Sequence, residues 1–252
     1  MIIIKSPDQI EGIRRSSQLA AQTLKHTAAF IKPGISTQKL NDLAHRFILD
    51  HQAIPAPFNY NGYPKSICTS VNNVVCHGIP SSKQILQKGD ILNIDITTIL
   101  NGFYGDVSAT YPVGQISSQA QKLLKVTQDS LSLAAKAVKP GRLLNEAIGK
   151  TIEDYVTPFG YAPVKLLGGH GVGVRFHEDP FVFHFYYPKD KTILKPGMIF
   201  TIEPMINASP SSEVTIDRQD GWTVRTLDGA LSCQFEHTIL VTDSGHQILT
   251  QL

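Results

Sequence analysis

Apolar residues recur at helical spacing in two parts of the chain that share one design. Near the start they are Ile10, Ile13, Ala20, Leu24 and Ile31. Ser6 can cap this helix and Pro7 suits its first turn, while Lys32-Pro33-Gly34 ends it. A second helix is expected from about Ser36, and its apolar side is formed by Leu40, Leu43, Phe47 and Ile48.

The same design returns about a hundred residues later. A helix is predicted over 119–138, and Lys139-Pro140-Gly141 ends it. A further helix then presents Leu144, Ile148, Ile152 and Val156. The two Lys-Pro-Gly stops lie 107 positions apart, from Lys32 to Lys139. A repeat at this spacing indicates an internal duplication.

Each half also contains a predicted strand that bears a carboxylate. Residues 88–95 end on Asp95 and residues 196–203 end on Glu203. Upstream of each strand a histidine stands beside glycine, His77 in one half and His170 in the other. Two units of helix, helix and strands predict an α+β fold with pseudo-two-fold symmetry, whose polar residues meet near the axis. Because no Ser-, Gly- or Pro-rich linker divides the halves, we expect one domain over residues 1–252, with half-units at about 5–115 and 116–249.

The composition narrows the class of protein. Of the 252 residues, 17% are charged and 42% are hydrophobic, which excludes disorder as the main state. A net charge of +2 without long basic runs argues against specific nucleic-acid binding. The three cysteines form no Cys-x-x-Cys pair, and no signal-peptide core or membrane-spanning apolar run is found. These features predict a cytoplasmic protein that does not bind membranes.

Four carboxylates fall in apolar, strand-like segments, and they are Asp95, Asp106, Glu203 and Glu236. Gathered in a core, they would repel one another, and each would have a raised pKa unless a cation neutralised them. Lys and Arg are scarce in these segments. Four carboxylates and one imidazole suit two divalent metal ions about 3.5–4 Å apart. Oxygen-rich ligation with one histidine suggests Mn²⁺, Fe²⁺ or Co²⁺ before Zn²⁺.

The residues alone leave open which histidine is the ligand. His170 lies in a glycine-rich run, and His177 follows seven residues later. The glycine run is not read as a dinucleotide-binding loop, because it lacks the preceding strand and the following helix. His177-Glu178 is not read as a zinc-protease motif, because position 181 is Phe where that motif has its second histidine.

Several short motifs occur in a fixed order along the chain. They are Val75-Cys76-His77-Gly78-Ile79-Pro80, Asn93-Ile94-Asp95, Gly105-Asp106, Gly169-His170-Gly171-Val172-Gly173, Phe176-His177-Glu178, Thr201-Ile202-Glu203-Pro204-Met205 and Phe235-Glu236-His237-Thr238. Together they resemble the type I methionine aminopeptidases, and the resemblance runs from about Lys5 to Leu249. It implies the pita-bread fold, with an antiparallel sheet flanked by helices. It also implies removal of the initiator methionine from nascent polypeptides whose second residue is small.

The resemblance also implies roles for individual residues. The metal ligands would be Asp95, Asp106, His170, Glu203 and Glu236, with Asp106 and Glu236 bridging both ions. Glu203 would move a proton to the leaving amine, His177 would donate to the developing oxyanion and His77 would contact the released amide nitrogen. The substrate methionine would lie in a slot lined by Tyr60, Tyr63, Cys68, His77, Phe176, His177 and Trp222.

Two positions depart from the family pattern. Asn61 stands where many relatives carry His, which bears on contacts at the rim of the cleft. Val107 follows Asp106 where Thr is frequent, which bears on a hydrogen bond around that ligand. The chain has neither the zinc-finger extension of eukaryotic type I enzymes nor the helical insertion of type II, so a minimal bacterial or organellar type is expected.

Two other functions compete with this interpretation. An X-Pro aminopeptidase of the same fold is disfavoured, because residues 1–35 leave no room for its preceding domain. A non-catalytic relative that holds peptides is disfavoured by the complete set of implied ligands. We expect a monomer, and association with the ribosome stays an open hypothesis, since the sequence has no isolated basic patch.

Overall fold

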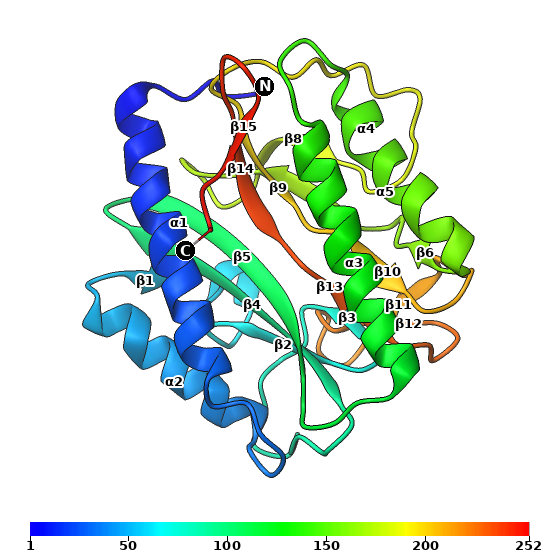
Figure 1. Ribbon diagram of the computed structural model, residues 1–252. Helices are drawn as coiled ribbons and strands as arrows, with labels where there is room; N and C mark the ends of the chain where they lie inside the picture. The colour runs from blue at the N-terminus through cyan, green and yellow to red at the C-terminus, as the bar shows by residue number, and fades with distance from the viewer. Residues whose placement is uncertain (252) are drawn as a thin grey trace.

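The first helix begins where the sequence predicts. Ser6 and Gln9 form a capping box, in which each side chain accepts a hydrogen bond from the backbone of the other, and Pro7 occupies the first turn. The computed structural model describes residues 1–251 (Figure 1). Its longer helices are α1 (Pro7–Ala28), α2 (Thr37–Asp50), α3 (Ser118–Ala137), α4 (Leu144–Ala147) and α5 (Gly149–Val156). Two short 3₁₀ helices cover Tyr60–Gly62 and Thr157–Phe159.

One predicted helix is interrupted. The apolar series from Leu144 to Val156 forms two helices, α4 and α5, because Ile148 adopts φ −109° and ψ −71°, outside regular helical geometry. All four apolar positions of that series are nevertheless buried, as the periodicity requires.

The strands are antiparallel throughout the described chain, and they form four small sheets. The first half contributes β1 (Ile54–Pro55), β2 (Cys68–Val71), β3 (Val74–Cys76), β4 (Ile91–Leu100) and β5 (Phe103–Pro112). The second half contributes β6 (Ala162–Pro163), β7 (Gly169–Gly171), β8 (Glu178–Val182), β9 (Ile199–Ile202), β10 (Met205–Asn207), β11 (Val214–Ile216), β12 (Val224–Thr226), β13 (Ser232–Gln234), β14 (His237–Val241) and β15 (His246–Ile248). The two main sheets are β1-β4-β2 with β5 beside β4, and β15-β14-β9-β7-β8.

The duplication is visible in matching contacts of the two halves. After the first Lys-Pro-Gly stop, Gly34 N donates to Leu86 O at 2.8 Å, and after the second, Gly141 N donates to Leu194 O at 2.8 Å. Each half also has an isolated antiparallel bridge just beyond its stop, Ser36 with Ile85 and Leu143 with Ile193. The predicted α+β fold with an internal repeat is therefore confirmed, and we propose that both halves belong to one domain.

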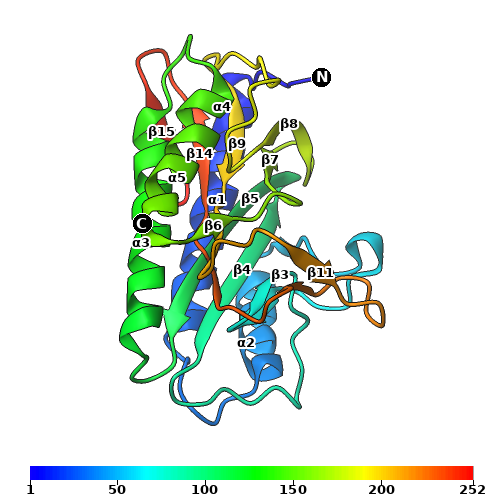
Figure 2. The same cartoon turned by 90° about the vertical axis from the view of Figure 1, so that its right-hand side faces the viewer.

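Helices cover one side of the strands, and short strands with their loops project on the other. Figure 2 shows α3 and α5 along one side, while β8 and β11 project on the other. One buried cluster lies under α3 and includes Leu123 and Phe200, and a second lies under α1 and includes Leu24 and Ile94. Gly105 lets α1 approach β5 closely, because a Cβ there would lie 2.2 Å from Ser17 N. In the described part of the chain, no helix combines the length and the apolar character needed to cross a membrane.

Two strands differ from their predicted extent. Asp95 lies in the middle of β4, which continues to Leu100, rather than at the end of the strand. The strand-like segment that bears Glu236 is divided into β13 and β14, and Glu236 occupies the break. Its backbone N–H donates to Ser108 O of β5 at 2.9 Å, so a contact between the two halves replaces a strand hydrogen bond there.

Candidate metal centre and active site

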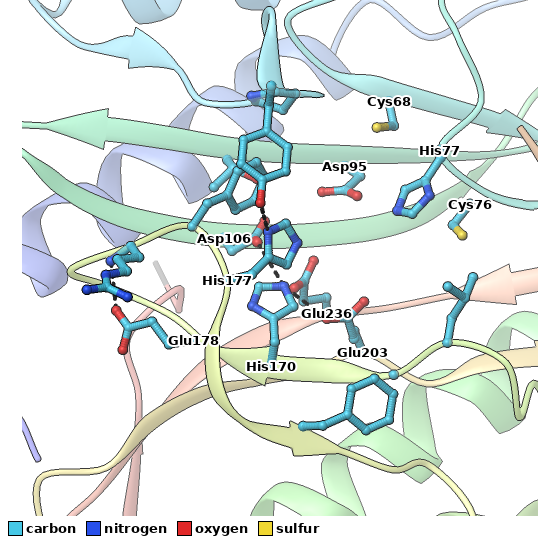
Figure 3. A pocket seen from close by; sticks show the side chains of 18 of the residues that line it. Cys68, Cys76, His77, Asp95, Asp106, His170, His177, Glu178, Glu203 and Glu236 are labelled. Carbon is cyan, nitrogen blue, oxygen red and sulfur yellow. Dashed lines mark hydrogen bonds and ion pairs between the residues drawn. The ribbon is translucent and has the colours of Figure 1, made fainter. Parts of the chain in front are cut away.

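The five predicted metal ligands come from both halves of the chain and line one cavity (Figure 3). They are Asp95, Asp106, His170, Glu203 and Glu236. Asp106 of β5 pairs with Thr97 of β4, and Thr97 lies two positions from Asp95. The two acids therefore share one face of this pair of strands. Register pairs Ile202 of β9 with His237 of β14, so Glu203 and Glu236 leave that pair at the same end. The carboxylates of Asp95, Asp106 and Glu236 approach within 4.8 Å of one another.

His170 completes this group of carboxylates. It lies on β7, and its Nε2 is 3.8 Å from Asp106 Oδ2 and 3.7 Å from Glu203 Oε1. The ring Nδ1 is 3.0 Å from the backbone oxygen of Gly171, and Nδ1–H donation to that oxygen leaves the Nε2 lone pair facing the acids. Burial, followed by the charge of the neighbouring His177, lowers the pKa of His170 to about 3, so the imidazole is neutral at physiological pH.

The carboxylates are held in a region that strongly disfavours their charges. Asp106 and Glu236 are only 4% and 3% exposed, and no Lys or Arg of the described chain pairs with any of the four acids. Burial raises the pKa of Asp106 to about 7. Burial and the neighbouring negative charges also raise the pKa values of Asp95, Glu203 and Glu236. Uncompensated acids in such a place need a cation.

The donor set fits divalent metal ions. Four carboxylates supply the oxygen ligands that Mn²⁺ and Fe²⁺ favour, and the neutral imidazole adds one nitrogen ligand. Three acids whose oxygens lie within 4.8 Å of one another are close enough to share ions between them. The residues present therefore match the metal requirement inferred from the sequence.

Hydrogen bonds from polar neighbours orient the acids. Thr97 Oγ1 donates to Asp106 at 2.7 Å, and Thr201 Oγ1 donates to Glu203 at 2.7 Å. Gln234 Nε2 donates to the other oxygen of Glu203 at 3.2 Å. Each of these residues lies two positions from a carboxylate, on the face that strand alternation predicts, but the sequence interpretation gave none of them a role in the site.

His184 is a contributor that the sequence interpretation missed. It is fully buried, and its Nε2 accepts a hydrogen bond from Glu203 N at 3.1 Å. Burial lowers the pKa of His184 to about 3, which keeps the ring neutral and able to accept. The signal was hard to detect, because this histidine interrupts an aromatic run, Phe181 to Tyr187, that is typical of core.

The two other predicted histidines lie on opposite sides of the acids (Figure 3). His177 Nδ1 is 2.9 Å from the hydroxyl of Tyr60, and its ring is 4.2 Å from that of His170, centroid to centroid. His77 adopts φ +55°, which is rare for a residue with a side chain. Burial lowers the pKa of His77 to about 4 and that of His177 below its usual value, so both rings are neutral donors at neutral pH.

Aromatic and sulfur side chains form a slot beside the acids. The cavity has a volume of about 570 Å³, and all seven predicted slot residues line it, namely Tyr60, Tyr63, Cys68, His77, Phe176, His177 and Trp222. The ring of Tyr63 meets that of Trp222 edge to face, with centroids 5.2 Å apart. Cys76, Leu167 and Met205 also line it, although the sequence interpretation did not assign them there.

A buried ion pair supports the loop that carries His177. Lys5 Nζ pairs with Glu178 Oε2, and the two side chains are 1% and 2% exposed. The other oxygen of Glu178 accepts from the backbone N–H groups of Val174 and Arg175, both at 2.7 Å. The N-terminal segment and the loop before His177 are thereby joined through one carboxylate.

The two departures from the family pattern lie away from the acids. Asn61 is exposed, has φ +47°, and does not belong to the described residues that line the cavity. Val107 is buried in the apolar cluster under α1, because strand alternation turns it away from Asp106. The expectation that Val107 alters a hydrogen bond around the metal ligand is therefore not met by its side chain.

Comparison with known proteins agrees with this geometry. Residues 11–243 match the model of metallopeptidase family M24, and the chain belongs to that family. It is similar to methionine aminopeptidase A of Synechocystis sp., with 48% identity over 249 residues that cover 99% of this chain and 97% of the relative. It is also similar to the methionine aminopeptidase of Escherichia coli K12, with 47% identity over 250 residues, 99% of this chain and 94% of the relative.

A solved structure supports the fold in the same way. The crystal structure of methionine aminopeptidase from Rickettsia prowazekii superposes with a TM-score of 0.96 at 45% identity, covering 100% of both chains. The predicted resemblance to the type I methionine aminopeptidases is thus confirmed.

The raised pKa values predict that metal binding releases protons. Near pH 6 the metal-free carboxyl of Asp106, with a pKa of about 7, is mostly protonated, whereas a ligand must be ionised. Titrating metal-free protein with Mn²⁺ should therefore release protons near pH 6 and progressively fewer as the pH rises through about 8. Calorimetry in two buffers of different ionisation enthalpy measures this number, and equal heats in both buffers near pH 6 would contradict the prediction.

Proposed function

We propose that the protein removes the N-terminal methionine from polypeptides whose second residue is small. One observation carries this proposal. The buried carboxylates line the same cavity as an apolar slot formed by aromatic and sulfur-containing side chains. Such a slot suits a flexible thioether side chain. Nascent polypeptides carry their initiator methionine in the cytoplasm, so the proposal includes action in that compartment.

Asp95, Asp106, His170, Glu203 and Glu236 are the residues that we propose as metal ligands. Divalent ions held there would polarise the scissile carbonyl and make water a stronger acid. We assign proton transfer to Glu203, which would accept a proton from the attacking water and deliver it to the leaving amine. Thr201 and Gln234 hold the Glu203 carboxylate in place for this transfer.

The two histidines supply neutral hydrogen-bond donors. With the Tyr60 hydroxyl donating to Nδ1 of His177, the remaining proton of that ring is on Nε2, where it can stabilise the oxyanion that develops on the carbonyl. To His77, which lines the same cavity, we assign contact with the amide nitrogen of the bond that breaks. Both roles require neutral rings, which the lowered pKa values favour.

A pair of peptides tests the proposed function. Protein stripped with a chelator and resupplied with Mn²⁺ or Co²⁺ should release Met from Met-Ala-Ser and leave Met-Lys-Ser intact. One methylene is worth only about 1–3 kcal/mol of discrimination in an apolar pocket, so a long second side chain must be excluded sterically. Equal turnover of the two peptides would overturn the proposal. A separate measurement, metal analysis of protein purified without added ions, identifies the resident metal. We propose that it is Mn²⁺, Fe²⁺ or Co²⁺ rather than Zn²⁺.

A further inference from the structure

A second cavity, with a volume of about 860 Å³, lies on the face of β5 that is turned away from the catalytic cavity. Asp106 of this strand lines the catalytic cavity. Strand alternation turns Val107, Ala109 and Tyr111 to the other face, where all three line the second cavity. We call this space the back cavity. Glu236 is the only described residue that lines both cavities, and its carboxylate belongs to the acid cluster of the metal centre.

The back cavity lies at the boundary between the two half-units. Helices α1 and α3, which precede the two Lys-Pro-Gly stops, form two of its walls, and β5 and β14 lie between these helices (Figure 1). Leu24 and Val107 of its lining belong to the buried cluster under α1, whereas Leu131 and Phe235 pack in the cluster under α3. Small-molecule sites commonly occupy such boundaries and measure about 300–1,000 Å³, so the back cavity has the size and place of a ligand site.

Apolar side chains form the floor of the back cavity. Leu24 and Leu131 contribute to it from the two helices, and Phe235 and Ile248 contribute from the strand side. The last two side chains are only partly buried, so apolar surface stays in contact with water there. A ligand with an apolar body would remove that surface from water, which is favourable.

The charged groups at the rim favour an anion. Lys25 of α1 and Lys136 of α3 line the back cavity, are exposed, and take part in no ion pair among the described residues. Asp129 also lines it, but this carboxylate is paired with Lys125 at 2.7 Å and accepts a hydrogen bond from the Tyr155 hydroxyl at 3.2 Å. Two unpaired ammonium groups beside an apolar floor suit a molecule with an apolar body and a negative head group.

From this combination we propose that the back cavity binds a small amphipathic anion, whose alkyl chain lies on the apolar floor and whose head group lies near the lysines of the rim. This inference does not rest on the proposed function, because it requires neither a metal ion nor a peptide substrate. Each methylene group buried on the floor should raise the affinity about fourfold. A cation with the same alkyl chain should not bind, because the lysines repel it.

The test uses decanesulfonate, below the concentration at which it forms micelles, because a sulfonate is a weaker metal ligand than a carboxylate. Calorimetry on the metal-loaded protein should show saturable binding at one site. Octanesulfonate, which is two methylenes shorter, should bind about tenfold or more weakly, and decyltrimethylammonium should show no saturable binding. Saturable binding of the cation with the same affinity would overturn the proposal.

Trp222 distinguishes the two cavities. It is the only tryptophan of the chain and lines the catalytic cavity. Its fluorescence should therefore stay unchanged while decanesulfonate binds. A fluorescence change that saturates with the calorimetric affinity would place the probe in the catalytic cavity and overturn the proposal.

Ser132→Trp tests the location directly. Ser132 is exposed on α3 and lines the back cavity, so a tryptophan there should fill the space and lower the affinity for decanesulfonate about tenfold or more. Leu133→Trp is the matched control, because Leu133 is 39% exposed on the same helix and does not belong to the lining. The melting temperature shows whether each variant is folded. Unchanged affinity in folded Ser132→Trp would overturn the proposal.

A charge reversal at the rim provides a second variant. Lys25→Glu/Lys136→Glu should also weaken binding about tenfold or more, and it replaces Ser132→Trp if that variant does not fold. Lys122→Glu, at an exposed position of α3 outside the lining, should leave the affinity unchanged. Equal affinity of the double variant and the wild type would overturn the assignment of the head group to the rim.

A second copy of the chain is the competing occupant. In that case the wild-type protein would sediment as a dimer in analytical ultracentrifugation, and Ser132→Trp would sediment as a monomer. That result, together with no saturable binding of decanesulfonate, would overturn the proposal of a small anion.

Discussion

Replacing Asp106 by asparagine should raise the melting temperature of the metal-free protein and lower the activity of the metal-loaded protein. The isosteric Asp106→Asn keeps the hydrogen bond from Thr97 but removes one anion from the acid cluster. The folded-state pKa of Asp106 is raised to about 7, so its contribution to stability is greatest at low pH and is lost as the pH rises through 7. Above that pH, the metal-free variant should therefore melt at a higher temperature than the metal-free wild type.

The same substitution should nearly abolish activity. Mutation of a residue that only supports a metal ligand costs about 10–100-fold in metal affinity or activity. Loss of Asp106, which we propose as a ligand, should therefore lower kcat/KM by more than about a hundredfold. Mn²⁺ should also raise the melting temperature of the variant much less than that of the wild type. Asp129→Asn, which changes a carboxylate paired with Lys125 on α3, is the control and should leave both measurements unchanged. A variant that binds Mn²⁺ and cleaves Met-Ala-Ser like the wild type would remove Asp106 from the metal centre.

Replacing His177 by alanine should reduce kcat while metal content and melting temperature are retained. Loss of one preorganised donor to an oxyanion costs about 10²–10³ in kcat, and His177 has no carboxylate among its described hydrogen-bond partners. Turnover of Met-Ala-Ser and metal stoichiometry should be measured on the same sample.

Tyr60→Phe provides a graded comparison for His177→Ala. It removes the hydroxyl that lies 2.9 Å from His177 Nδ1 and leaves the imidazole in place. The loss in kcat should be smaller, because the donor remains but its orientation is less restricted. Full activity of His177→Ala would exclude this histidine from catalysis.

Local signals predicted the helices well. The caps at Ser6 and Ser36 and the two Lys-Pro-Gly stops act within a few residues, so one sequence contains what is needed to locate them. Strand alternation alone also puts polar residues on the faces of the acids, Thr97 with Asp95, Thr201 with Glu203 and Gln234 with Glu236.

What the sequence did not predict depends on contacts between distant segments. The strand break at Glu236 exists because that residue bonds to β5, 128 positions earlier at Ser108, and periodicity carries no trace of it. Likewise, the support that His184 gives to Glu203 becomes visible only when the segment after β8 lies beside the site. The choice of His170 over the other histidines came from the family resemblance, and the position of its Nε2 beside two acids now supports it.

The Lys5–Glu178 ion pair bears on the order in which the molecule can assemble. Its partners are 173 residues apart, so closing this contact costs more loop entropy than any hairpin of the fold. During synthesis Lys5 is made long before Glu178, so its ammonium group stays exposed to water until Glu178 has been added. A chain arrested between these two positions has its first helices but lacks the carboxylate that fastens the His177 loop. We therefore expect peptidase activity to appear late in folding, after the two ends of this long loop have met.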